Sequence, residues 1–233
     1  MSTHLKQSMI LARESLNLKE RLSSHKPFLK ILPDHIKTKI LSHTKSMPSR
    51  QASILVPIVH IANKQIPSIL FTRRSSYLKN HSNEICFPGG HVDEDEDCLL
   101  KTAIRETKEE LSPHFTYDFD NGLVIIGRTD DIPSAGLVPV TPFVGYFREI
   151  FNEQDIQKIF PGNKSEVAQV FTVPLDELIQ IEQSEPLARL MMDGPVYNTS
   201  EGKIWGLTAI VLKRIIDEIL CPIFIKEKTS ESE

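Results

Sequence analysis

Residues 87–113, FPGGHVDEDEDCLLKTAIRETKEELSP, are the part of this chain that most constrains its fold. A Pro-Gly-Gly turn leads into five consecutive acidic residues, Asp93 to Asp97, and then into a segment with apolar residues at helical spacing. Pro113 ends that segment, because proline cannot continue a helix. The stretch therefore predicts a glycine turn, an acidic loop and a helix over 98–111, in that order.

The predicted helix carries three glutamates on one face. Glu106, Glu109 and Glu110 stand at i, i+3 and i+4, a spacing that places their side chains together. Arg105 offsets part of their mutual repulsion, and a hard divalent cation with oxygen ligands, Mg²⁺ or Mn²⁺, would offset the rest. Such acids alone are also typical of a solvated helix face. The order of turn, loop and helix favours the metal site.

Strand-like runs flank this helix on both sides. The runs over 52–62 and 66–74 are separated by a short polar segment and predict a hairpin. Two further strands follow at 122–131 and 136–147. The segment 166–181 reads as a strand leading into a short helix, and 203–219 reads as an amphipathic final helix. A run of strands interrupted by two helices predicts an α/β fold with a mixed sheet and helices packed on it.

Length and charge limit the organisation and the function classes. The 233 residues fit one domain with an appendage. Residues 1–49 are predicted to form an N-terminal helical extension, residues 50–225 the main domain, and residues 226–233 a charged tail. The net charge of −4 gives no support for binding nucleic acid through the whole surface. The longest apolar run, from Ile54, is too short to span a membrane.

Cysteine usage and the first residues bear on the compartment. The three cysteines are far apart and no secretory segment is present, which favours an intracellular protein in a reducing environment. Residues 1–13 are basic and lack acids, so they weakly resemble a mitochondrial presequence; an amphipathic helix is the alternative interpretation.

The order of glycine turn, acidic loop and Arg-Glu-x-x-Glu-Glu helix resembles the Nudix box. The resemblance implies a Nudix α/β/α sandwich and a pyrophosphatase that cuts a nucleoside diphosphate linked to another group. It implies that Glu106, Glu109 and Glu110 bind Mg²⁺ or Mn²⁺ and that Glu109 shares in catalysis. It also implies that the Gly90 carbonyl is a further metal ligand and that Arg105 supports catalysis by orienting a glutamate.

The acidic loop is one residue longer than in the usual box. Counting forward from Gly90 nominates Glu96 as the acid that supports the site, whereas counting back from Arg105 nominates Asp97. We expect Glu96 to support the site and Asp97 to cap the helix, where an acid complements free N–H groups and the helix dipole. Ser112 replaces the glycine that usually closes the box.

The longer loop is also the basis of a finer resemblance. Together with TAIRE at 102–106 and LFTRRSSYLKNHSNEICFPGG upstream, it is similar to the coenzyme A pyrophosphatase branch of the family, the peroxisomal or mitochondrial CoA diphosphatases. The likeness covers about residues 53–212. It implies a small-molecule substrate, coenzyme A or acyl-CoA, and a mitochondrial or peroxisomal location, with the cytosol as the alternative. Another Nudix substrate and a catalytically inactive nucleotide-sensing module stay open as other interpretations; the oligomeric state is not predicted.

Cations upstream of the box and an acid downstream complete the predicted site. Arg73, Arg74 and Lys79 are predicted to bind substrate phosphates, because a guanidinium binds phosphate bidentately; ordinary surface cations are the alternative. Glu166 lies just before a predicted strand. Other Nudix enzymes use a glutamate outside the box near the metal or the water, so Glu166 is a candidate general base or else an exposed loop acid.

Three nearby residues carry structural expectations. His81 is expected to form structural hydrogen bonds rather than to act in catalysis. Asn83 stands where the related branch has glycine, and asparagine tolerates the left-handed conformation that such a position requires. Trp205 is expected to pack in the core against the final helix.

Overall fold

The protein is described by a computed structural model that places residues 30–31, 50–112, 117–187 and 192–221. The predicted helical extension and the charged tail fall outside these ranges, apart from two residues. Those two, Lys30–Ile31, form a short strand, β1, instead of continuing a helix, because they pair with β6 of the main sheet.

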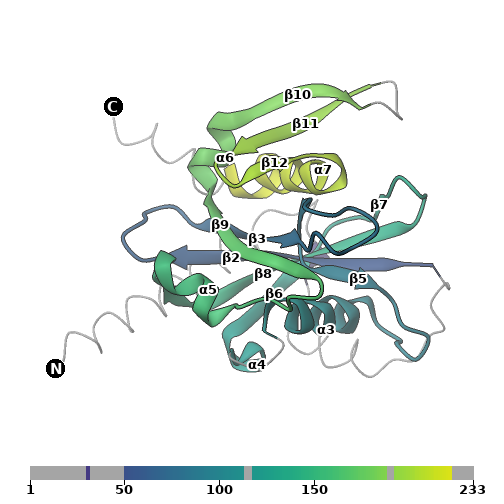
Figure 1. The fold of residues 1–233 in the computed structure, drawn as a ribbon, viewed down its shortest axis with the longest axis horizontal. Helices are drawn as coiled ribbons and strands as arrows, with labels where there is room; N and C mark the ends of the chain where they lie inside the picture. The colour runs from purple at the N-terminus through teal and green to yellow at the C-terminus, as the bar shows by residue number, and fades with distance from the viewer. Residues whose placement is uncertain (1–29, 32–49, 113–116, 188–191, 222–233) are drawn as a thin grey trace.

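A mixed sheet forms the centre of the fold (Figure 1). Within the described residues it has nine strands, with the order β1-β6-β8-β2-β3-β4; β5 also pairs with β2, β7 with β8 and β9 with β3. Strands β2 and β8 run parallel and the other pairs are antiparallel. The remaining strands of this sheet are β2 (Ala52–Ile61), β3 (Ser68–Arg74), β4 (Ile85–Cys86), β5 (Gly89–His91), β6 (Leu123–Arg128), β7 (Ile132–Pro133), β8 (Pro139–Phe151) and β9 (Val167–Pro174).

The apolar run of β2 is explained by its central place. Leu55 packs into the core on the side of α3, whereas Val56 and Ile58 pack into the core on the opposite side. A strand covered on both faces needs apolar side chains at consecutive positions, not at alternating ones. The predicted hairpin is confirmed, since β2 pairs antiparallel with β3.

Helices cover both faces of the main sheet, and this confirms the predicted α/β architecture (Figure 1). Helix α3 (Leu99–Leu111) lies on one face and buries Leu100, Ala103 and Leu111. Helix α7 (Gly206–Ile215) and the π-helical turn η2 (Ile216–Leu220) lie on the other face. The short helices are α4 (Phe119–Gly122), η1 (Glu153–Asp155), α5 (Ile156–Ile159) and α6 (Leu175–Ile181).

A small antiparallel sheet, not expected from the sequence, stands on the α7 side (Figure 1). Its strands are β10 (Glu182–Leu187), β11 (Met192–Thr199) and β12 (Gly202–Ile204). Strand β12 leads directly into α7 and so fixes where that helix begins. No helix in the described ranges is both long and apolar enough to cross a membrane.

Candidate active site

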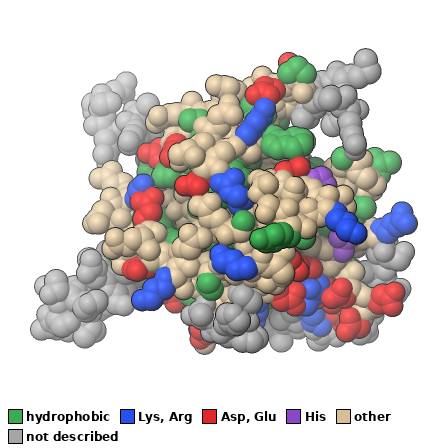
Figure 2. All heavy atoms as spheres, viewed as in Figure 1, with side chains coloured by type: hydrophobic (Ala, Val, Ile, Leu, Met, Phe, Trp, Pro, Cys, Tyr) green, Lys and Arg blue, Asp and Glu red, His purple; other side chains and the backbone are tan. Residues whose placement is uncertain are grey.

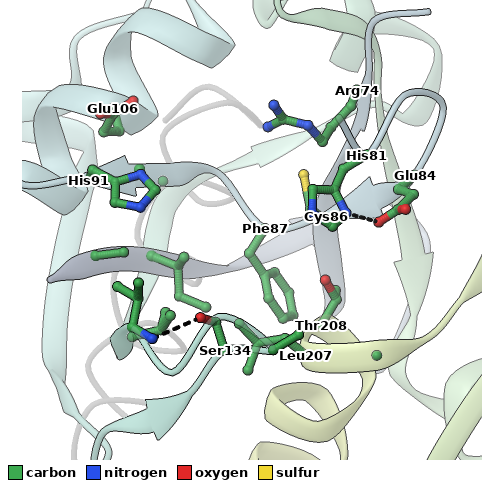
Figure 3. Close-up of a pocket in the computed structure, with 18 of the residues that line it drawn as sticks. Arg74, His81, Glu84, Cys86, Phe87, His91, Glu106, Ser134, Leu207 and Thr208 are labelled. Carbon is green, nitrogen blue, oxygen red and sulfur yellow. Dashed lines mark hydrogen bonds and ion pairs between the residues drawn. The ribbon is translucent and has the colours of Figure 1, made fainter. Parts of the chain in front are cut away.

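A cavity of about 700 Å³ opens where α3 and the first turn of α7 reach the same end of the main sheet (Figure 3). It brings together five of the residues predicted to form the site: Arg74, Gly90, Glu106, Glu110 and Glu166. These residues come from four separate segments of the chain, and the fold alone brings them together.

Two glycines allow β5 to pack closely against its neighbours, Gly89 against β2 and Gly90 against α3. Gly89 pairs with Ile54 of β2 and has a φ of +148°, and a Cβ there would collide with the β2 backbone. A Cβ on Gly90 would overlap the carboxylate of Glu106. The glycine turn of the sequence therefore has a steric role at both positions. A Cβ on residue 89 would push β5 away from β2, and a Cβ on residue 90 would force the Glu106 carboxylate to turn away or α3 to shift.

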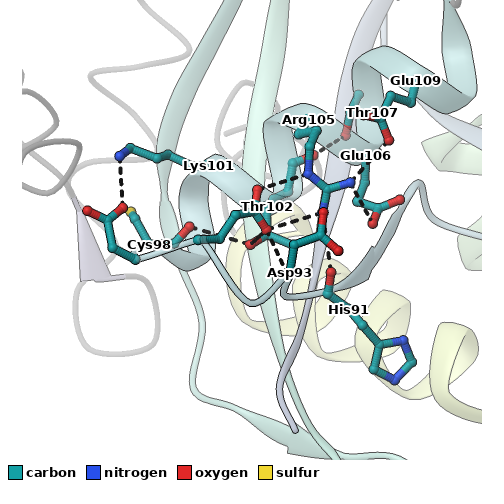
Figure 4. Close-up of polar contacts among 12 residues, drawn as sticks. His91, Asp93, Cys98, Lys101, Thr102, Arg105, Glu106, Thr107 and Glu109 are labelled. Atoms are coloured by element: carbon teal, nitrogen blue, oxygen red, sulfur yellow. Dashed lines mark hydrogen bonds and ion pairs between the residues drawn. The ribbon is translucent and has the colours of Figure 1, made fainter. Parts of the chain in front are cut away.

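Arg105 is the centre of a network of carboxylates (Figure 4). Its Nη1 donates to Glu106 Oε1 at 3.0 Å and to Glu109 Oε2 at 3.1 Å. Its Nε and Nη2 donate to the two oxygens of Glu96 at 2.9 and 3.1 Å. The hydrogen bond with Glu96 is the main cause that raises the pKa of Arg105. Arg105 thereby holds Glu106 in position. Its supporting role in catalysis stays a prediction.

The structure separates the two acids that the sequence left in competition. Glu96 also accepts from Thr102 Oγ1 at 2.7 Å. Desolvation acts to raise the pKa of Glu96, but the hydrogen bonds from Arg105 and Thr102 outweigh it, so this pKa is lowered. Asp97 instead pairs with Lys101 at 2.8 Å. The expectation that Asp97 caps α3 was wrong: the N-cap is Cys98, and the helix start has no side-chain cap.

Acidic side chains are concentrated on the surface over α3 and the loop before it (red, lower right in Figure 2).

The different contacts of Glu96 and Asp97 predict different effects on catalysis. We expect Glu96→Gln to lower kcat by about tenfold or more, because one charged hydrogen-bond acceptor of Arg105 is lost and Glu106 is held less firmly. Asp97→Asn should keep kcat within about twofold, since its partner Lys101 lies outside the cavity lining. Mg²⁺-dependent kinetics on both variants test this, and equal kcat values would contradict it.

Glu110 is the most deeply buried of the acids in the cavity, with 4% of its surface exposed. Burial is the main cause that raises its pKa to about 8, and the charges of Glu106 and Glu166 add to the effect. Arg74 and the Gly89 N–H act in the opposite direction. Its Oε2 atom has no hydrogen-bond partner. Glu106 shows the same pattern: burial raises its pKa, although Arg105 offsets part of that rise.

These carboxylates fit a hard divalent cation. Glu110 Oε2 is a buried oxygen without a partner, and Glu106 and Glu166 line the same cavity. Oxygen ligands of this kind suit Mg²⁺ or Mn²⁺. In the part of the chain that the structure describes, no three His, Cys, Asp or Glu side chains already stand together at ligating distances. Binding a cation would therefore draw the carboxylates closer together.

The other predicted site residues lie away from the cavity lining. Glu109 is half exposed and bonds to Arg105, and Lys79 is exposed. Arg73 donates to the Glu201 carbonyl and, at 3.3 Å, to Gln169 Oε1. Its guanidinium also lies 3.6 Å from the Glu201 carboxylate. Arg73 thus joins β3 to the turn between β11 and β12, whereas Arg74 points into the cavity (Figure 3).

The two neighbouring arginines should respond differently to truncation. Arg74→Ala should raise KM at least about tenfold, the cost of losing a charged hydrogen bond to phosphate, with little change in Tm. Arg73→Ala should lower Tm by several degrees, because a partly buried charged contact worth roughly 1–3 kcal/mol is lost. Thermal melts and steady-state kinetics on both variants test this. A KM effect confined to Arg73→Ala would reverse the assignment.

Some cavity residues were not predicted from the sequence. Trp205 was expected in the core, but 47% of its surface is exposed and it lines the cavity, so that expectation was wrong. His81 bonds Glu84 Oε2 through Nδ1 at 2.9 Å, as expected for a structural group, and it also lines the cavity. Asn83 has a φ of +62°, which confirms the expected left-handed conformation. The loop that carries Ser134 was missed because its small residues give no periodic signal.

The chain belongs to the Nudix hydrolase family, since residues 50–193 match the NUDIX domain. Members of this family hydrolyse a nucleoside diphosphate linked to another group, and they generally use divalent metal ions. A Yersinia pestis (strain Pestoides F) protein named "Uncharacterized Nudix hydrolase NudL" is 30% identical over 191 residues, which is 80% of this chain and 87% of that protein. The protein of the same name from Yersinia pseudotuberculosis serotype O:1b gives the same values.

Solved structures of this class are more distant. A Nudix hydrolase from Alicyclobacillus acidocaldarius is 19% identical with a TM-score of 0.43, covering 77% of this chain and 95% of that one. A C. elegans Ap4A hydrolase in a binary complex is 22% identical with a TM-score of 0.41, covering 56% and 85%.

Proposed function

We propose that the protein hydrolyses the diphosphate of coenzyme A or acyl-CoA, giving 3′,5′-ADP and 4′-phosphopantetheine or its acyl derivative. The observation that carries this is the joint lining of one cavity by Glu106, Glu110 and Glu166 together with Arg74. A diphosphate substrate requires carboxylates that can hold a metal ion and, beside them, an arginine that can bind a phosphate. The choice of coenzyme A rests on the motif resemblance upstream of and within the acidic loop.

Arg74, Arg105 and Glu166 have different roles in this reaction. Arg74 binds a phosphate oxygen and neutralises part of its charge, since its guanidinium faces the cavity. Arg105 holds Glu106 in place from outside the cavity lining. Of the two glutamates predicted to take part in catalysis, Glu166 lines the cavity and Glu109 does not. Glu166 is therefore better placed to take the proton from the attacking water.

Glu106, Glu110 and the Gly90 carbonyl are the groups that would hold Mg²⁺ or Mn²⁺. When bound, the ion supplies charge neutralisation at the diphosphate and lowers the pKa of a coordinated water. The burial of Glu110 suits this role, because a buried carboxylate with an oxygen that has no hydrogen-bond partner is costly and a cation relieves that cost.

A panel of diphosphates tests the proposal. Coenzyme A, acetyl-CoA, ADP-ribose, a dinucleotide and a nucleoside triphosphate are incubated with Mg²⁺, and products are identified by mass. We expect 3′,5′-ADP and phosphopantetheine products at a kcat/KM at least about tenfold above the other substrates. Preferred cleavage of ADP-ribose or a dinucleotide would assign another Nudix substrate. Binding without turnover of any compound would indicate a nucleotide-sensing module.

A further inference from the structure

The cavity has a second wall that the chemistry above does not use. Opposite Glu106 and Arg74 lie Ser134, Leu207 and Thr208, with Phe87 between the two sides (Figure 3). The wall as a whole is built mostly from small or apolar side chains of three segments: the start of β2, the loop between β7 and β8 together with the start of β8, and the N-cap and first turn of α7. Its members include Ile54, Ala135, Val138, Val140, Trp205 and Leu207.

Trp205 is the unusual member of this wall. It stands at the N-cap of α7, lines the cavity and keeps 47% of its surface exposed. Large apolar side chains are otherwise mostly buried here, and a half-exposed tryptophan inside a cavity leaves apolar area open to water. The next residue, Gly206, has a φ of +63°, and a Cβ there would meet no atom within 4 Å. Open space therefore lies beside the Gly206 backbone, which also lines the cavity.

The position of Trp205 is fixed by contacts outside the cavity. Strand β12 precedes it and is held by the Thr199 and Glu201 turn, where Arg73 and Gln169 bind Glu201. On the facing loop, Ser134 Oγ accepts from the Val138 N–H at 3.1 Å, and the Ser134 N–H donates to the Val138 carbonyl at 2.9 Å. The apolar wall is thus assembled before any ligand binds, which lowers the entropic cost of binding.

We propose that Trp205, Leu207 and the 134–138 loop form an apolar subsite for an apolar substituent carried on the diphosphate substrate. Aliphatic side chains dominate this wall. They fit an alkyl or acyl chain better than a nucleobase, which needs hydrogen-bonding partners at its edges. The subsite determines substrate preference and deepens the proposed function, on which it rests for the identity of the diphosphate.

The chain offers its own probe of this subsite, since Trp205 is the only tryptophan among the 233 residues. Fluorescence of Trp205 is titrated in a Glu110→Gln background with Mg²⁺, where turnover is suppressed. The ligands are coenzyme A and its acetyl, butanoyl and octanoyl thioesters, with 3′,5′-ADP as the part that lacks the chain. We expect a chain-dependent change in emission and at least about tenfold tighter binding of the octanoyl ester than of coenzyme A, because each buried methylene contributes up to about fourfold.

Variants separate the subsite from general damage. In Leu207→Ala, the affinity ratio of the octanoyl ester to coenzyme A, measured by Trp205 fluorescence, should fall to about threefold or less. In Trp205→Ala, which keeps Glu110, the same ratio is measured from kcat/KM and should fall as far. The readout is this ratio, because a general loss of binding would weaken coenzyme A and its octanoyl ester equally and leave the ratio unchanged. Tyr77→Ala is the matched control: it removes an aromatic side chain that is 89% exposed and lies outside the cavity lining, and it should leave the ratio unchanged.

The outcomes distinguish this inference from the proposed function. A second series of ligands, geranyl and farnesyl diphosphate, provides apolar chains of different length on a diphosphate without coenzyme A. If binding depends on chain length, and on Leu207 and Trp205, only in the isoprenyl diphosphate series, the subsite stands and the coenzyme A assignment fails. The apolar subsite is overturned if neither the acyl esters nor the isoprenyl diphosphates show a chain-length effect. It is also overturned if 3′,5′-ADP alone changes Trp205 emission as strongly as the acyl esters do.

Discussion

Glu110→Gln should remove activity and, in the absence of metal ions, make the protein more stable. The carboxylate is 4% exposed, its Oε2 has no partner, and burial beside Glu106 raises its pKa to about 8. In the unfolded chain the same group titrates near its ordinary value of 4.5. The folded state therefore binds more protons between these two values, and metal-free stability should fall as the pH rises from about 4.5 to about 8.

The amide that replaces this carboxylate in the variant cannot ionise, so the variant escapes that loss. Above pH 8 the difference amounts to at most about 5 kcal/mol, and a fraction of that would raise Tm by about 4 °C or more. Thermal melts in EDTA at pH 5 and pH 9 test the prediction: the Tm advantage of the variant should appear at pH 9 and shrink at pH 5. With Mg²⁺ the order should reverse, and kcat should be at least about a hundredfold below wild type.

Either of two results would remove Glu110 from the metal site. One is a folded Glu110→Gln protein with near-normal kcat. The other is a metal-free variant that is less stable than wild type at pH 9, because this would mean that the carboxylate has a stabilising partner. The measurements are separate, so a loss of activity caused by misfolding cannot be mistaken for a loss of metal binding.

The parts of the fold that were predicted depend on local patterns. Helix α3 and its carboxylates follow from the 3.6-residue period of their own segment, and the order of turn, loop and helix is written in consecutive residues. Strands β2 and β3 carry continuous apolar runs that few other structures explain. Glu106 and Glu110 share a cavity because one turn of helix places them on one face.

The parts that were missed depend on contacts between distant segments. Strands β10 and β11 contain Pro186 and Pro195, and proline weakens the sequence signal of a strand. Without the small sheet, nothing in the sequence shows that Trp205 stands at a cavity instead of in the core. One signal was available: Arg73 and Arg74 are adjacent on a strand and therefore point to opposite faces, so both could not be expected to bind the same phosphate.

Gly90→Ala should be nearly as damaging to activity as loss of a metal ligand, although it adds a single methyl group. A Cβ at this position would overlap the carboxylate of Glu106, so the side chain must turn away or α3 must shift from β5. Arg105 resists the shift, since it ties Glu106 to Glu96 on the loop. Misplacing a catalytic group by about 1 Å can cost on the order of a hundredfold, and we expect kcat to fall by about that factor.

A second glycine of the same cavity supplies the control. Gly136 also lines the cavity, but a Cβ there would lie 3.9 Å from Ser134 Oγ, an ordinary contact distance, and its φ is not positive. Gly136→Ala lies on the loop assigned to the apolar subsite, away from the carboxylates, and should leave the affinity for Mn²⁺ unchanged, because no group has to move. Both variants should fold, as circular dichroism and Tm can show. Isothermal titration with Mn²⁺ should detect weakened binding in Gly90→Ala alone. Equal affinity for Mn²⁺ in the two variants would mean that close approach of Glu106 to β5 is not required, and the assignment of Gly90 and Glu106 to one metal site would then fail.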